Sequence, residues 1–333
     1  MSKRLKSLFS AALMLSATGV AHAGEVEAWT PTLTDLRAAS AGIIMPQSVG
    51  GLSLSKSGEV SNGGKGIDNY AQYLSEDGAI QATLYIYMPS YADASIAAYM
   101  TDKAIMTRFG SKTHRTAYAS TAAGGHSGAA IRAVYDDAAE GALTTAAAFV
   151  HAGRWLVKLR VTGPSAQRKA VLAGLDGMLG AMQFDNASAL HSVAPVQLTA
   201  CGPRDATDSL PIAPVEAGLS RDGRDPMCVS GRIDTAEGSY EMLQQANLSH
   251  GTMIVPMDDA GTVLAFDPTK DRTGYQLSIH SVGQTDLYGV YPQVPTAQQI
   301  AAIIEGKDPQ TARAGKIADY AANGEMTIRT GAR

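Results

Sequence analysis

Cysteine and aromatic residues are the scarcest residue types in this 333-residue chain. Only Cys201 and Cys228 occur, and Phe, Trp and Tyr make up 6% of the sequence. The two cysteines form no Cys-x-x-Cys motif and have no histidine close to them in sequence, which disfavours a redox or metal role. In an oxidising compartment such a pair most simply forms a disulfide, worth roughly 3 kcal/mol on the chain-entropy estimate. With few aromatics, the core must be built from small and aliphatic side chains.

Long hydrophobic runs are also absent. The longest N-terminal apolar run covers residues 8–20, which is shorter than the 20 or so residues that a membrane-spanning helix needs. Three basic residues precede it within residues 3–6, and Ala-His-Ala follows it at 21–23. This order is typical of a secretory signal peptide. We expect no membrane span, cleavage near Ala23 and Gly24, and a periplasmic or secreted protein, with a bacterial periplasm favoured.

Clusters of positive charge are missing from the rest of the chain. Loss of residues 1–23 removes three basic residues and no acid, so the formal charge goes from −4 to −7. Nucleic acid and anionic lipid both select clustered Lys and Arg. We therefore expect no nucleic-acid partner.

Motifs for metal and cofactor binding are absent too. Neither His-x-His nor His-x-x-x-His occurs, and the Gly-Gly-Lys-Gly stretch at 63–66 has the wrong spacing for a phosphate loop. We expect no metal and no cofactor.

Residues 153–184 show most clearly how the core is built. Trp155, Val157, Leu159 and Val161 alternate with Leu156, Lys158 and Arg160, which is the period of a half-buried strand. A Gly-Pro pair follows at 163–164, after which Ser165 can cap a helix with an apolar stripe over residues 171–182.

Residues 48–185 form the first predicted domain, after an arm at 24–47 that includes a short helix at 33–43. A strand at 80–88 and a helix at 91–109 precede three strands at 129–135, 143–151 and 155–161. Short connections make these three an antiparallel meander. An α+β class follows, with an antiparallel sheet packed against helices.

The order of these elements resembles a known family. Strand, helix, antiparallel meander and a closing helix that ends at Gln183-Phe184 are similar to the α/β/α sandwich of PsbP and Mog1-like domains. The resemblance implies that fold for residues 48–185, and a binding or accessory role. It implies no catalytic residue.

The second half is predicted in two parts. Five prolines between residues 195 and 226 indicate a linker over 186–230, held by the Cys201–Cys228 disulfide. Residues 231–333 are predicted as a smaller α+β domain, with helices at 237–248 and 308–322. Thr296 and Gln299 have the spacing of a capping box for another helix.

Ser127 is the one candidate nucleophile. Gly125-His126-Ser127-Gly128-Ala129 is similar to the G-x-S-x-G nucleophile elbow, which needs a strand before the serine and a helix after it. The residues after Ser127 are predicted to be a strand, so a plain hairpin turn is favoured. A secreted serine hydrolase that uses Ser127 stays as the alternative function.

Tyrosines are the one local enrichment with a possible binding role. Tyr85 and Tyr87 share one face of the 80–88 strand and either line a groove or pack in the core. Taken together, these features favour an exported, non-catalytic binding or accessory protein of the bacterial cell envelope. Its partner, an unknown protein or small molecule, and its oligomeric state are not encoded in any motif.

Overall fold

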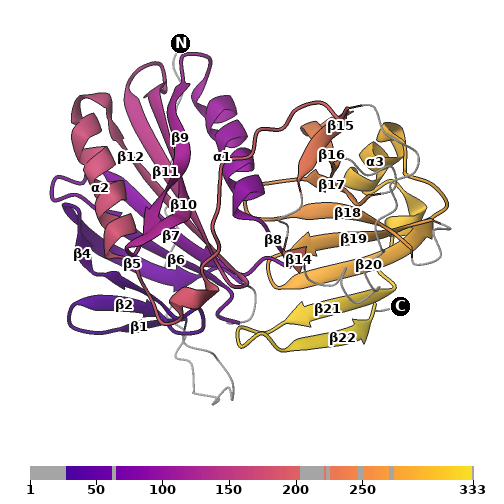
Figure 1. Cartoon of the computed structure of the whole chain (residues 1–333), viewed down its shortest axis with the longest axis horizontal. Helices are drawn as coiled ribbons and strands as arrows, with labels where there is room; N and C mark the ends of the chain where they lie inside the picture. Colours follow the sequence, from indigo (N-terminus) through magenta and orange to yellow (C-terminus); the bar gives the residue numbers. More distant parts are fainter. Residues whose placement is uncertain are drawn as a thin grey trace, which may run out of the picture.

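A computed structural model describes residues 28–61, 65–202, 221–222, 226–246, 251–269 and 274–331 (Figure 1). The expected signal peptide, its cleavage site and residues 203–220 of the expected linker lie outside the described residues. None of the described helices is long and apolar enough to cross a membrane.

Two eight-stranded antiparallel sheets dominate the structure. In the first, the strand order is β4-β5-β6-β7-β12-β11-β10-β9, so two four-stranded meanders meet where β7 pairs with β12. Its strands are β4 (Ser48–Val49), β5 (Leu52–Glu59), β6 (Asp68–Leu74), β7 (Gln81–Tyr87), β9 (His114–Ala123), β10 (His126–Ala138), β11 (Leu143–Ala152) and β12 (Trp155–Pro164).

The second large sheet is a single meander in which every strand pairs with the next one along the chain. Its strands are β15 (Met227–Thr235), β16 (Gly238–Gln245), β17 (Met253–Pro256), β18 (Val263–Pro268), β19 (Tyr275–Ser281), β20 (Gln284–Tyr291), β21 (Lys316–Tyr320) and β22 (Met326–Thr330).

The remaining described strands form two smaller sheets. An antiparallel sheet of four strands lies beside the first large sheet, and β8 pairs with β14 in parallel. Their strands are β1 (Trp29–Pro31), β2 (Asp35–Ala38), β3 (Ile43–Pro46), β13 (Gln183–Phe184), β8 (Tyr91–Ala92) and β14 (Arg221–Asp222).

The described helices number three α-helices and three short 3₁₀ turns. The α-helices are α1 (Ala94–Phe109), α2 (Arg168–Ala181) and α3 (Ala297–Ile304), and the 3₁₀ turns are η1 (Ser165–Gln167), η2 (Ala187–Ala189) and η4 (Pro309–Thr311). Helix α2 packs on β11 and β12, and α1 lies between the first large sheet and the second half (Figure 1). The Thr296–Gln299 capping box opens α3 as the spacing predicts.

The expected α+β class is wrong. Strands account for 51% of the described residues and helices for 17%, and the three larger sheets are antiparallel. The predicted C-terminal α+β region is in fact an eight-stranded meander that carries one short α-helix in its described part. The proposed domain boundaries at residues 185 and 230 stay predictions.

Three predicted helices are strands for reasons of tertiary pairing. Residues 33–43 contain β2 and the turn that leads into β3, with Gly42 at a φ of 64°. Residues 238–245 form β16, paired along its length with β15. Within 308–322, a 3₁₀ turn is followed by β21, held between β20 and β22. In each case cross-strand partners outweigh a weak local helical pattern.

Strand β12 lies at the centre of the first sheet and is buried on both faces. Trp155, Val157, Leu159 and Val161 face α2 within the largest core cluster, as the alternation predicts. The opposite face was expected to be open to solvent. Instead Leu156 is 1% exposed, and Lys158 is 8% exposed. The reason is that α1 and the second half cover this face.

Apolar and polar contacts join the two halves at this junction. Ala318 and Tyr320 of β21 belong to the core cluster of the first half. Ile96 of α1 packs with residues of β16, β17 and β18. The Ser90 hydroxyl lies 3.0 Å from His280 Nδ1 across the same junction, with both residues buried.

The predicted disulfide is confirmed. Cys201 and Cys228 are bonded with an S–S distance of 2.06 Å. The bond ties the end of the described linker to β15, where Cys201 N also donates to the Val229 carbonyl. Such a disulfide fits an extracellular or periplasmic protein, because disulfides form and persist in oxidising compartments.

Trp155→Ala tests the core directly. Trp155 is 7% exposed and packs in the main cluster. Truncating a buried tryptophan typically costs about 3–5 kcal/mol, because transfer and cavity terms add. We expect a loss of roughly 3 kcal/mol or more in the free energy of unfolding, measured by denaturant titration. An unchanged unfolding midpoint would contradict this burial.

Candidate functional site

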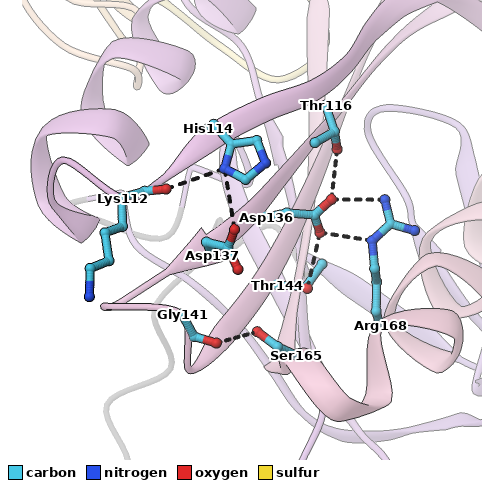
Figure 2. Close-up of polar contacts among 9 residues, drawn as sticks. All are labelled: Lys112, His114, Thr116, Asp136, Asp137, Gly141, Thr144, Ser165 and Arg168. Carbon is cyan, nitrogen blue, oxygen red and sulfur yellow. Dashed lines mark hydrogen bonds and ion pairs between the residues drawn. The ribbon is translucent and has the colours of Figure 1, made fainter.

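A polar cluster lies where the meander meets the start of α2 (Figure 2). Asp136, near the end of β10, accepts two hydrogen bonds from Arg168, from Nε at 2.8 Å and from Nη2 at 2.9 Å. The hydroxyl of Thr116 donates to it from β9 at 2.9 Å, and that of Thr144 donates from β11 at 3.2 Å. One carboxylate therefore joins three strands to a helix.

The environment keeps Asp136 ionised. Its pKa is lowered, first by the hydrogen bonds from Arg168 and further by those from Thr116 and Thr144, while partial burial opposes the shift. The same interaction raises the pKa of Arg168. The bidentate geometry explains the strength of the effect, since an Arg–carboxylate fork forms two charge-assisted bonds.

The connection after Asp136 has unusual backbone conformations. Asp137, Ala139 and Glu140 have φ values of 54°, 51° and 61°, and they are the non-glycine residues with positive φ in the described part of the chain. Residues with a Cβ lose roughly 1–2 kcal/mol each in this region, with Asp tolerating it best. Such strain persists only where surrounding contacts impose it, and it concentrates at functional loops.

Ser165 supplies one of the contacts that fix this loop. Its hydroxyl donates to the Gly141 carbonyl at 2.8 Å, and its N–H donates to the Ala142 carbonyl at 2.9 Å. The sequence suggests Ser165 as a helix cap, but α2 begins after a 3₁₀ turn and its N-cap is Gln167. Ser165 therefore holds the loop rather than the helix (Figure 2).

The loop presents charged side chains to solvent. Asp137 Oδ2 lies 3.5 Å from His114 Nδ1, and Glu140 Oε2 lies 3.0 Å from Lys112 Nζ. All four side chains are more than half exposed. Exposed ion pairs contribute less than about 1 kcal/mol, so they exchange readily with other charged groups. We call residues 136–141, which are the last three residues of β10 and the turn that follows, the β10–β11 loop, and we regard this segment as the candidate binding site.

Tyr85 and Tyr87 share a face of β7, but that face is covered. Tyr87 is 3% exposed and packs in the cluster beneath α1. Burial, and then nearby carboxylates led by Asp259, raise the pKa of its hydroxyl. The half-buried ring of Tyr85 lies 5.8 Å from Lys158 Nζ. The two rings thus pack at the junction of the halves, and the groove role of these tyrosines stays a prediction.

Lys158 has its charge partner in the same junction. Its Nζ lies 2.5 Å from Oδ2 of Asp259, in the turn between β17 and β18, and Thr101 of α1 donates to the same oxygen at 3.2 Å. Burial alone would raise the pKa of Asp259. The attraction and hydrogen bond of Lys158, with the bond from Thr101, outweigh burial and lower it. The pair therefore connects the two halves.

Ser127 is exposed at the second position of β10, after the two-residue turn of the β9–β10 hairpin. The strand continues to Ala138, so no helix follows the serine. The strand-to-helix elbow that the hydrolase alternative needs is not formed here. No group of three His, Cys, Asp or Glu residues that could hold a metal is found among the described residues.

No protein-family profile and no curated protein sequence matches this chain. Among solved structures, a mutant of the protein Mog1 matches 47% of this chain and 98% of its own length, with 9% identity and a TM-score of 0.33. The expected resemblance to Mog1 and PsbP is thus supported only as a weak likeness of fold.

No motif in the sequence marks Asp136 and Asp137 as functional residues. No sequence signal connects Asp136 to Arg168, which is 32 residues away. Nothing in the sequence indicates that Ala139 and Glu140 have positive φ angles, because Gly or Asn usually occupies such positions.

Asp136→Asn tests the electrostatics of the cluster. A lowered native pKa means that Asp136 contributes stability above its unfolded pKa, about 3.9, and loses it as pH falls through the native pKa. The stability difference between wild type and Asp136→Asn should be largest near neutral pH and shrink below about pH 4. Urea titrations at several pH values measure it. A difference that is constant with pH would contradict the assignment.

Proposed function

We propose that this chain is an exported, non-catalytic binding or accessory protein of the bacterial cell envelope, and that the β10–β11 loop contacts its partner. The observation that carries the proposal is the strained, clamped conformation of that loop. Half-buried Ala139 and exposed Glu140 hold positive φ angles where glycine would cost less. Strain of this kind is retained where presentation of a surface matters.

The scaffold beneath the loop supports this proposal. Asp136, the first residue of the loop, is hydrogen-bonded to β9, β11 and α2. Ser165 donates a hydrogen bond to Gly141, the last residue of the loop. Rigid elements that position an exposed loop are a common arrangement for binding. Less ordering entropy is then lost when a partner binds.

The charges of the loop indicate the chemistry of the partner. Asp137 and Glu140 are exposed carboxylates whose present partners, His114 and Lys112, form only weak surface pairs. A protein segment that carries Lys or Arg can replace those pairs. Export is supported by the signal-like N-terminus and by the Cys201–Cys228 disulfide.

Affinity capture with charge-neutral variants tests the proposal. The immobilised chain is incubated with envelope extract, and bound proteins are identified by mass spectrometry. Asp137→Asn with Glu140→Gln removes both charges and keeps side-chain size. We expect this variant to lose a protein that the wild type retains at low salt, by roughly tenfold or more if two charge pairs form.

The matched control carries Asp234→Asn with Glu237→Gln. These two exposed acids lie at the β15–β16 hairpin of the second half, away from the β10–β11 loop. The control should retain the same protein as the wild type. Equal capture of that protein by both variants would contradict the proposal that the β10–β11 loop contacts the partner.

A further inference from the structure

Strand β22 forms one edge of the second large sheet. It pairs with β21 on one side, and no described strand pairs with its other side (Figure 1). All five of its residues are exposed, and Met326 and Ile328 are 42% and 49% exposed. Few other large apolar residues in the described part of the chain are as exposed to solvent.

The pairing with β21 shows which backbone groups of β22 point outward. The N–H of Ala321 donates to the Glu325 carbonyl, and the N–H of Gly331 donates to the Gly315 carbonyl. Antiparallel ladders alternate, so residues 325, 327, 329 and 331 bond with β21. Met326, Ile328 and Thr330 therefore direct both their N–H and C=O groups away from the sheet.

This edge has neither a proline nor a bulge that would prevent pairing. Proteins protect open edges with proline, bulges or charged side chains. Strand β22 contains no proline, and its register with β21 has no bulge. Its one charged residue, Arg329, bonds Asp319 at 2.7 Å on the neighbouring strand.

We infer that β22 pairs with β22 of a second copy of this chain, antiparallel and around a two-fold axis at Ile328. In this register Ile328 faces the same residue of the other copy, and Met326 faces Thr330. The three outward-pointing residues of each copy then all find partners, with two hydrogen bonds for each facing pair. The two eight-stranded sheets become one continuous sheet.

Other two-fold registers fit less well. An axis at Met326 would place Thr330 opposite the β21–β22 turn, and an axis at Thr330 would place Met326 beyond the end of the strand. An axis at Thr327 or Arg329 also brings outward-pointing residues face to face, but it pairs only two of the three, and the Arg329 axis sets two arginines opposite each other. Only the Ile328 register uses the whole edge.

The side chains agree with this register. Met326 and Ile328 lie on the same sheet face as Ala318 and Tyr320, which are buried against the first half. Pairing of two copies thus extends an apolar surface that already forms an interface within the chain. Arg329 faces Thr327, so no like charges lie directly opposite each other.

Sedimentation velocity over a concentration series tests the inference. The purified wild-type chain should show a reversible monomer–dimer equilibrium. Ile328→Lys places two like charges opposite each other at the axis and should weaken association by roughly tenfold or more. The control Val60→Lys alters an apolar residue outside β22 that is 59% exposed, somewhat more than Ile328. This variant should dimerise as the wild type does.

Cysteine cross-linking tests the register itself. Facing residues that exchange hydrogen bonds have Cα atoms about 5.5 Å apart, within disulfide range. Ile328→Cys should therefore form a disulfide-linked dimer under mild oxidation. Met326→Cys should not, because the two introduced cysteines would lie four residues apart along the strand direction, roughly 13 Å.

A chain that stays monomeric at all concentrations would overturn the inference. So would equal dimerisation of wild type and Ile328→Lys, or equal cross-linking of Met326→Cys and Ile328→Cys. Unchanged thermal melting of the Ile328→Lys monomer would show that loss of pairing, and not misfolding, explains its behaviour.

Discussion

The two-sided burial of β11 and β12 is the constraint on which the rest of the structure depends. Nine of the ten residues of β11 are buried, and β12 is nearly as covered. A strand at the centre of an antiparallel sheet often keeps one face in solvent. Here α2 covers one face, while α1 and the second half cover the other. The second half is therefore part of the packing of the first sheet.

This burial explains the charges found at the junction. Lys158 must extend from a covered face, and a buried ammonium group without a partner would be strongly destabilising. Asp259, from the turn between β17 and β18, supplies the opposite charge, and Thr101 of α1 donates to the same carboxylate. Three elements from both halves thus meet at one ion pair. The β10–β11 loop, in contrast, is fixed by its own cluster around Asp136 and stays exposed.

Local patterns predicted the meander, the helices at α1 and α2, the α3 capping box and the disulfide. Each depends on neighbouring residues or, for the cysteines, on there being only one possible pair. The class was wrong because β16 and β21 gain their structure from strands on either side, which no local pattern records. The second covered face of β12 was missed for the same reason: Leu156 and Lys158 look solvent-facing until α1 and the second half are in place. The Asp136–Arg168 contact and the positive φ angles likewise follow from tertiary contacts.

The central claim is that the two large sheets share buried contacts at their junction and unfold as one cooperative unit. Differential scanning calorimetry of the wild-type chain tests this most directly, because it reports how many units unfold independently. Shared burial of Ala318, Tyr320 and Ile96, together with the Lys158–Asp259 pair, predicts a single transition whose calorimetric and van't Hoff enthalpies agree. Two resolved transitions, one for each sheet, would contradict the account.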